Sequence, residues 1–233
     1  MAKPNLVLVP GLLCDAALWA PQRTHLADVA ETFVADVTRE ETTAAMAEAV
    51  IAAAPAGRFA LAGLSMGGYV ALEIIRRAPE RVTRLALLDT NARADTEDSK
   101  ARRRALIEES ELGDFKGVTK RLLGMFVHPD RLGDAGLIDE VVAMTARVGK
   151  EAFARQQRAI MGRADARAWL GDIRVPTLVL VGRQDVLTPL DLHEEIAGRV
   201  ARAKLVIVEN SGHLTTLERP EAVSAVLRYW LQD

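Results

Sequence analysis

The sequence predicts an open sheet of parallel β-strands with helices packed on both faces, the α/β class. Three observations predict it: short apolar runs without polar alternation, helix-like segments between these runs, and a glycine-rich turn that joins one strand to a helix. Continuous apolar runs are typical of strands covered on both faces, as in a parallel sheet. The repeated order of strand and helix favours a sheet with helices on both sides.

The predicted strands and helices alternate along most of the chain. The apolar runs that we predict to be strands lie at residues 6–9, 33–35, 59–62, 85–88, 178–181 and 205–208. The segments that we predict to be helices in the core lie at residues 43–54, 66–78, 190–200 and 220–231. We therefore expect a sheet of about six strands, flanked by helices.

One long segment between two predicted strands contains no convincing strand of its own. Its helical patterns lie at residues 99–109, 115–126, 136–148 and 151–161. Ordinary crossover helices are the alternative, but a stretch of roughly 80 residues far exceeds the usual connection. We predict a core of residues 1–94 and 172–233, and a helical cap of residues 95–171 inserted over the carboxyl ends of the strands.

The length of the chain fits one core domain with an insertion, and its composition is that of a globular protein. The 233 residues are 49% hydrophobic and 27% charged, with a net charge of -2, so no basic footprint for nucleic acid is present. Cys14 is the only cysteine, which excludes an intrachain disulfide, and no Cys/His cluster has zinc spacing. The first apolar run is too short for a signal peptide or a membrane span, and we expect a cytoplasmic protein.

The glycine-rich turn at residues 61–68 is the most informative motif of the chain. It reads Leu-Ala-Gly-Leu-Ser-Met-Gly-Gly and follows an apolar run. A G-x-S-x-G turn between a strand and a helix presents its serine, here Ser65, as a nucleophile at the carboxyl end of the strand. Glycines flank the serine because the turn is tight and its backbone strained. The alternative is a turn with a serine helix cap, so the prediction depends on partners elsewhere.

Two downstream residues can complete a nucleophilic site with Ser65. A serine hydroxyl needs a base, and His213 follows the last predicted strand directly after a glycine. The base needs a carboxylate to orient and stabilise it, and Asp185 follows the strand at residues 178–181. Both lie at the carboxyl edge of the sheet, where ligands of such folds bind. Asp89, after another strand, is the rival carboxylate, and we favour Asp185.

An oxyanion hole would need two backbone N–H donors near Ser65. Met66 directly follows the nucleophile at the start of a helix, and the second donor should come from the loop after the first strand. We predict the Leu12 N–H, which follows Pro10 and Gly11. The alternative is an ordinary turn, for which a Pro-Gly pair is common.

The order Ser65, Asp185, His213 resembles that of the α/β-hydrolase fold family. The resemblance spans nearly the whole chain and includes the elbow, the acid loop at residues 182–185 and the base loop at residues 211–213. The chain looks like the small bacterial carboxylesterases, enol-lactonases and acyl-carrier methyl esterases of this fold. It departs from the family pattern in beginning at the strand that is usually third, which implies that the usual antiparallel strand is missing. It also has proline where the family often has histidine in the first loop.

The resemblance implies hydrolysis of a small to medium carboxylic ester, lactone or thioester through an acyl-enzyme, with no cofactor or metal. Activity should rise as His213 loses its proton, around pH 6 to 7 for an ordinary histidine. The same three residues also serve carbon–carbon bond hydrolases, lyases and perhydrolases of this fold, and nearby motifs do not separate them. A ligand-binding protein without catalysis is a further alternative.

The substrate-binding residues that we predict are apolar and lie close to the site in sequence or in the insertion. They are Leu13, Leu64, Phe126, Leu187 and Leu214. Other apolar residues of the insertion are expected mainly to pack its helices together: Phe115, Leu122, Met125, Met144, Ile160 and Met161. Trp19 and Tyr69 could belong to either the pocket or the core.

Two features near the predicted site have alternative interpretations. The arginines at residues 102–104 could bind an acyl carrier or coenzyme A, but we interpret them as a solvated helix face. Cys14 lies near the predicted oxyanion loop and is either a small buried hydrophobic residue, the commoner case, or a thiol-sensitive site.

Overall fold

The computed structural model of the protein describes residues 3–112 and 120–233. Its strands are β1 (Asn5–Val9), β2 (Glu31–Val34), β3 (Phe59–Leu64), β4 (Val82–Leu88), β5 (Thr177–Gly182) and β6 (Ala203–Val208). Its α-helices are α1 (Ala20–His25), α2 (Thr43–Ala53), α3 (Met66–Arg77), α4 (Glu97–Leu112), α5 (Lys120–Phe126), α6 (Ala135–Met161), α7 (Leu190–Arg199), α8 (Thr215–Glu218) and α9 (Pro220–Gln232).

The six strands form one sheet in the order β2-β1-β3-β4-β5-β6. Every strand pair of the described residues is parallel. The strands β3 and β5 are buried along their whole length, which explains their continuous apolar sequences. The predicted parallel sheet of about six strands is therefore confirmed, and the carboxyl ends of all strands meet at one edge.

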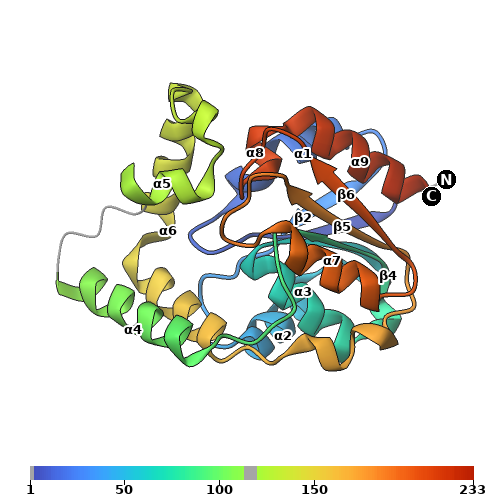
Figure 1. The fold of residues 1–233 in the computed structure, drawn as a ribbon. Helices are drawn as coiled ribbons and strands as arrows, with labels where there is room; N and C mark the ends of the chain where they lie inside the picture. Colours follow the sequence, from blue (N-terminus) through green and yellow to red (C-terminus); the bar gives the residue numbers. More distant parts are fainter. Residues whose placement is uncertain (1–2, 113–119) are drawn as a thin grey trace.

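Helices cover both faces of the sheet (Figure 1), as the sequence predicts. Alternate residues of each strand enter different apolar clusters because successive side chains of a strand point to opposite faces. Leu6 and Leu8 of β1 join the cluster that contains Trp230 of α9, whereas Val7 and Val9 join the cluster that contains Ile74 of α3. Figure 1 shows α1 and α9 on one side of the sheet and α2, α3 and α7 on the other.

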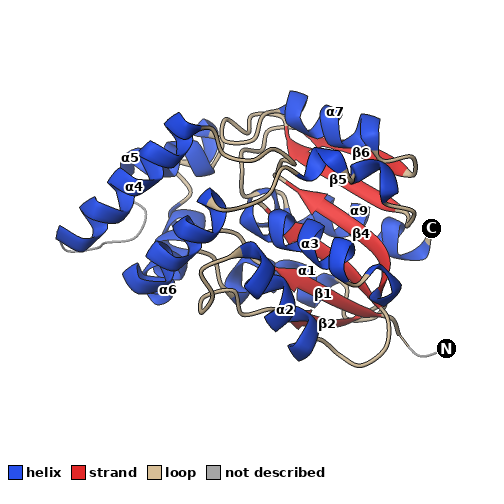
Figure 2. Ribbon diagram, turned by 90° about the horizontal axis from the view of Figure 1, so that it is seen from below, coloured by secondary structure: helices blue, strands red, loops and turns tan. Residues whose placement is uncertain are grey.

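The segment between β4 and β5 supplies the helices α4, α5 and α6. Figures 1 and 2 show them gathered at one end of the sheet, opposite the chain termini. The helices predicted at residues 136–148 and 151–161 form the two halves of α6, which bends at Gly149, where φ is 75°. Glycine tolerates that positive φ, which explains a bend at this residue. The first part of the helix predicted at residues 115–126 lies outside the described residues.

Candidate active site

Ser65 lies in the turn between β3 and α3, where its backbone is strained. Its φ is 55°, a value unusual for a residue other than glycine. The Ser65 N–H donates to the carbonyl of Leu88 (2.9 Å), which holds the turn against β4. A side chain at Gly67 would collide with the carbonyl of Val9, so glycine is required there for the helix to approach β1. The sheet and α3 thus fix the serine in its conformation at the carboxyl edge.

His213 reaches Ser65 from the loop between β6 and α8. Its Nε2 lies 2.9 Å from the Ser65 Oγ, and its side chain is almost completely buried. The backbone N–H groups of His213 and Leu214 both donate to the carbonyl of Phe126, at 3.0 Å each. Glu218 accepts hydrogen bonds from the Gly212 N–H (2.9 Å) and, in the insertion, from the His128 N–H (2.6 Å). The loop that carries His213 is therefore bound directly to the end of α5.

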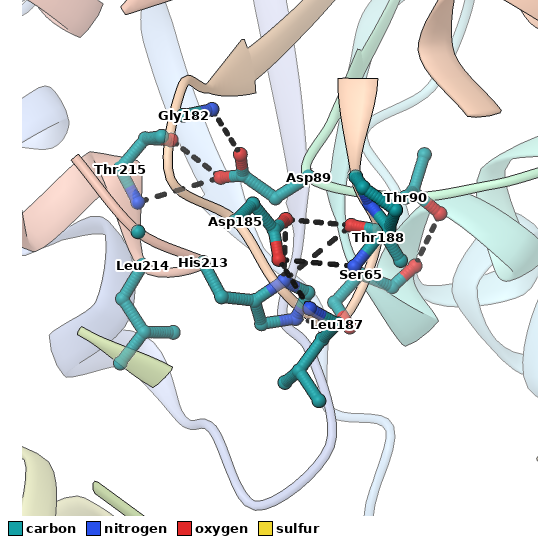
Figure 3. A network of polar contacts seen from close by, with 12 residues as sticks. Ser65, Asp89, Thr90, Gly182, Asp185, Leu187, Thr188, His213, Leu214 and Thr215 are labelled. Carbon is teal, nitrogen blue, oxygen red and sulfur yellow. Dashed lines mark hydrogen bonds and ion pairs between the residues drawn. The ribbon is translucent and has the colours of Figure 1, made fainter. Parts of the chain in front are cut away.

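Asp185 orients the opposite side of the histidine ring, as Figure 3 shows. Its Oδ2 lies 2.8 Å from the His213 Nδ1 and also accepts a hydrogen bond from the Thr188 Oγ1 (2.6 Å). Its Oδ1 accepts from the backbone N–H groups of Leu187 (2.9 Å) and Thr188 (3.0 Å). With Nδ1 donating to Asp185, Nε2 is free to accept the Ser65 proton. The structure thus joins the three predicted residues in one hydrogen-bonded chain.

Asp89, the alternative carboxylate, accepts hydrogen bonds from groups other than His213. It is completely buried, and its Oδ1 accepts from the Gly182 N–H (3.0 Å) while its Oδ2 contacts the Thr215 Oγ1 (2.5 Å). These bonds join the ends of β4 and β5 to the start of α8 (Figure 3). Geometry therefore separates the two acids: Asp185 contacts His213, and Asp89 ties together the backbone beneath it.

The protonation equilibria of this cluster follow from burial and close charges. Burial alone would lower the pKa of His213, but the charge and hydrogen bond of Asp185 outweigh it and raise that pKa above 6.5. Burial would raise the pKa of Asp185, yet the charge of His213 and hydrogen bonds from His213 and Thr188 hold it below its ordinary value. Burial, followed by the charge of Asp185, raises the pKa of Asp89 well above its ordinary value. The ionised form is thus favoured at the carboxylate beside the histidine and disfavoured at Asp89.

His193 is a second buried histidine near Ser65, and it has a different role. Its Nε2 accepts from the Thr90 N–H (2.9 Å), and its Nδ1 lies 3.2 Å from the carbonyl of Pro189, to which it donates. Burial lowers the pKa of His193 to about 4, so the ring is neutral at ordinary pH. Thr90 in turn donates through its Oγ1 to the carbonyl of Ser65 (2.8 Å). His193 therefore supports the turn through Thr90 rather than contacting the serine hydroxyl.

The two predicted oxyanion donors come from the residue directly after Ser65 and from the loop that follows β1. Met66 is the first residue of α3, so its N–H has no acceptor within the helix. The Leu12 N–H likewise has no hydrogen-bond acceptor among the described residues. Both donors are available for a negatively charged oxygen, and the start of α3 adds the positive end of its dipole.

A glutamine from the insertion holds the Leu12 loop in place. Leu13 has a φ of 59°, a strained value for leucine, and its N–H donates to the Gln156 Oε1 of α6 (3.0 Å). The Gln156 Nε2 donates to the carbonyl of Val37 (3.2 Å), and the side chain is completely buried. Nothing in the sequence pattern distinguishes Gln156, because only packing brings α6 to this loop.

The Ser65 hydroxyl and the His213 ring open into a cavity of about 380 Å³, hereafter the Ser65 pocket. All five residues predicted to bind substrate line it: Leu13, Leu64, Phe126, Leu187 and Leu214. Leu122, Met125 and Ile160 of the insertion line it as well, and Tyr69 belongs to the pocket wall. Trp19 and Met144 are buried in the apolar core, and Phe115 lies outside the described residues. The volume and the mostly apolar wall are typical of a small-molecule site.

Polar residues that were not among the predicted substrate-binding residues line another part of the Ser65 pocket. Asn91, Asp95, Arg103 and Arg163 all belong to its wall. The interpretation of residues 102–104 as a solvated helix face is wrong for Arg103, which bonds to Asp95 and Gln157, although its two neighbours are exposed. Helical spacing explains the difference, because consecutive residues of α4 point in directions about 100° apart.

Cys14 also lines the Ser65 pocket, and its burial disfavours the reactive thiolate form. Burial raises the pKa of Cys14 to about 12, and its Sγ lies 3.4 Å from the carbonyl of Leu12. Across residues 3–112 and 120–233, no cluster of three or more His, Cys, Asp or Glu side chains could hold a metal ion. Over the same residues, no helix combines the length and apolar character that crossing a membrane requires.

The comparison with known families agrees with this geometry. Residues 6–226 match the model of the alpha/beta hydrolase family. The chain belongs to this family. A pimeloyl-[acyl-carrier protein] methyl ester esterase of Neisseria meningitidis serogroup C is 30% identical over 174 residues, which are 73% of this chain and 68% of the relative. Family membership confirms the resemblance seen in the sequence motifs.

Solved structures show the same architecture as this α/β hydrolase. A thermophilic esterase from Thermogutta terrifontis matches with a TM-score of 0.91 and 27% identity, over 99% of this chain and 90% of that one. The enol-lactonase from Burkholderia xenovorans LB400 matches with a TM-score of 0.84 and 22% identity, over 100% of this chain and 93% of that one. At 22% identity, the similarity to the enol-lactonase shows a common fold only. These matches confirm the predicted fold class.

Proposed function

We propose that this α/β hydrolase cleaves small to medium carboxylic esters, with Ser65 as nucleophile, His213 as general base and Asp185 as the orienting carboxylate. The observation that carries the proposal is the continuous hydrogen-bonded chain from the Ser65 Oγ through His213 to Asp185, which opens into the Ser65 pocket. A strained serine beside a buried imidazole is the arrangement that activates a hydroxyl for attack on a carbonyl carbon.

Acylation follows from this geometry. The Ser65 Oγ attacks the ester carbonyl carbon while its proton passes to the His213 Nε2. The carbonyl oxygen becomes an oxyanion and accepts hydrogen bonds from the Leu12 and Met66 N–H groups. Asp185 stabilises the imidazolium that forms. The C–O bond to the alcohol then breaks, and the alkoxide leaves with the proton from Nε2, so that the acyl group remains on the Ser65 Oγ.

Deacylation repeats these steps with water as the nucleophile. His213 takes a proton from water, the hydroxide adds to the acyl carbon, and the same two N–H groups hold the second oxyanion. The bond to the Ser65 Oγ breaks, the serine recovers its proton from Nε2, and the carboxylic acid leaves. A lactone passes through the same steps, and a thioester does so with a C–S bond broken and a thiol released. The pocket wall rather than the chemistry therefore selects the acyl chain.

We also propose that residues 95–171 form a cap over the core of residues 1–94 and 172–233. The pocket wall supports this division, because Phe126 and Ile160 of the insertion and Ser65 and Leu64 of the core line one cavity. The ester specificity is supported by the relatives: the Neisseria protein is named for a methyl ester and the Thermogutta protein as an esterase.

The test compares the wild type with Ser65→Ala on p-nitrophenyl acetate, butyrate and octanoate. Intact-mass spectrometry on the same mixtures detects an acyl adduct. We expect Ser65→Ala to lose the adduct and about 10⁴- to 10⁶-fold in kcat, because the nucleophile is absent. Ser224→Ala is the matched control, since the Ser224 Oγ pairs with His25 (2.9 Å) on α1, outside the pocket wall, and it should keep both activity and adduct.

Each other outcome contradicts the proposal. Full activity in Ser65→Ala would exclude Ser65 as nucleophile. A wild type that hydrolyses no ester but cleaves the carbon–carbon bond of a β-diketone would assign the same residues to carbon–carbon hydrolysis. Binding without turnover of any ester, lactone or thioester would favour the ligand-binding alternative.

A further inference from the structure

One part of the Ser65 pocket wall carries an excess of positive charge. Three arginines line the cavity, Arg93, Arg103 and Arg163, whereas Asp95 is the only carboxylate in its wall among the described residues. Arg93 pairs with Glu195 on α7 (2.8 Å), outside the cavity. Arg103 and Arg163 therefore share the single charge of Asp95, which leaves one positive charge without a partner.

The two inner arginines are held rigidly around Asp95. The Arg103 Nε donates to one carboxylate oxygen (2.7 Å) and the Arg163 Nη1 to the other (2.6 Å). Arg103 also donates through Nη1 to the Gln157 Oε1 (2.7 Å), and the Arg163 guanidinium lies 4.3 Å from the centre of the Tyr69 ring. The side chain of Arg163 is only 7% exposed and that of Asp95 only 4%. Little conformational freedom remains to be lost when a ligand binds.

Each guanidinium retains a donor group for a ligand. Arg103 donates through Nε and Nη1, and Arg163 also donates through Nε and Nη1, so neither Nη2 has an acceptor among the described residues. Both residues line the Ser65 pocket, and the exposed fraction of the side chain is 23% for Arg103 and 7% for Arg163. A part-buried positive charge with free N–H groups is costly unless an anion pairs with it, and a carboxylate suits the planar geometry of guanidinium groups.

We propose that the Arg103–Arg163 pair binds a carboxylate, so that the preferred substrates are monoesters of dicarboxylic acids. The ester carbonyl lies at Ser65, the methylene chain lies along the apolar wall, and the free carboxylate accepts hydrogen bonds from the two arginines. The identity of the substrate rests on the proposed function, whereas the anion site itself does not. The reaction consumes water and releases an alcohol and a dicarboxylate.

The test uses two substrates of the same shape that differ in charge. Monomethyl adipate carries a free carboxylate, and its primary amide replaces that group with a neutral one. We expect the wild type to prefer the acid about ten- to a hundredfold in kcat/KM, in proportion to charge-assisted hydrogen bonds. Arg103→Met should lower kcat/KM on the acid much more than on the amide and so abolish most of this preference, and Arg103→Lys should restore part of it.

The matched control is Arg104→Met, which removes an exposed arginine from the same helix, outside the pocket wall. It should leave the preference unchanged. Equal activity of the wild type on the acid and the amide would overturn the proposal. So would an Arg103→Met variant that loses activity on both substrates equally, because that result indicates a structural role.

A binding measurement separates this inference from the proposed function. Adipate is titrated calorimetrically into Ser65→Ala and into Ser65→Ala combined with Arg103→Met. The measurement reports binding alone and does not depend on catalysis. A loss of about ten- to a hundredfold in adipate affinity when Arg103 is replaced supports the anion site. This conclusion holds even if the wild type does not hydrolyse p-nitrophenyl acetate, because that result refutes only the esterase proposal. Equal binding to both variants, or none to either, overturns the anion site while leaving the esterase proposal to its own test.

Discussion

Replacing Gln156 with methionine should damage catalysis although Gln156 lies outside the Ser65 pocket wall. The change removes the acceptor of the strained Leu13 N–H and the donor to the Val37 carbonyl, both buried. Leaving two buried groups unpaired costs about 1–3 kcal/mol each, so the free energy of unfolding should fall by roughly 2–6 kcal/mol. The Leu12–Leu13 peptide also loses its anchor, which loosens the predicted oxyanion donor beside it.

The loss in kcat should not exceed the loss that follows when one oxyanion donor is removed completely. Complete removal of such a donor costs about 10²- to 10³-fold in kcat, and a loosened donor should cost about ten- to a hundredfold. Because the donor acts mainly in the transition state, kcat should fall while KM changes little. Gln156→Glu keeps an oxygen opposite the Leu13 N–H and should recover part of the kcat.

The assay measures kcat and KM on p-nitrophenyl butyrate well below the unfolding temperature of each variant, together with inhibition by phenylboronic acid. A boronate forms a tetrahedral adduct with the serine, so its inhibition constant should rise in parallel with the loss in kcat/KM. Arg155→Met is the control: it removes a hydrogen bond from α6 to the Thr38 carbonyl (2.9 Å) without touching Leu13. A Gln156→Met variant that is destabilised but retains its kcat would refute the positioning role.

Two further predictions concern protonation. The kcat/KM of the wild type should rise with pH through a midpoint above 6.5, because Asp185 raises the pKa of His213 and only the neutral ring accepts the Ser65 proton. Asp185→Asn should lower that midpoint and should also lower kcat by about 10⁴-fold. An unchanged midpoint would contradict the conclusion that Asp185 raises the pKa of His213. The pKa of Cys14 is raised from 9.0 to about 12, so iodoacetamide should alkylate the folded protein about 1,000-fold more slowly than the urea-unfolded chain, as intact-mass time courses will measure. Rapid alkylation with loss of activity would instead make Cys14 a thiol-sensitive site.

The structure changes the sequence-based expectation for the pH profile. An ordinary histidine predicts a midpoint around pH 6 to 7. Burial lowers the pKa of His213, but the charge of Asp185, together with its hydrogen bond to the ring, shifts that pKa upward overall. The extent to which His213 is buried and its distance from Asp185 both depend on packing. The direction of the pKa shift could therefore be obtained only from the folded protein.

The sequence by itself determined the sheet and the side of it on which the site lies. Continuous apolar runs predict parallel strands, and the carboxyl ends of parallel strands share one edge, so Ser65, Asp185 and His213 were predicted to gather there. The glycine before Ser65 also follows from local geometry, since a side chain at Gly63 would meet the backbone carbonyl of Gly67 in the same turn. These features depend on patterns short enough to be visible in the chain.

Only the tertiary structure decided which of two carboxylates contacts His213 and which polar residues line the Ser65 pocket. Asp185 and Asp89 both follow strands, but Asp89 is bonded to Gly182 and Thr215. Helical spacing shows that α4 and α6 have two faces, yet it does not say which face meets the core. The inward positions of Arg103 and Gln156 depend on contacts between segments far apart in the sequence, and such contacts are set by packing of the whole chain.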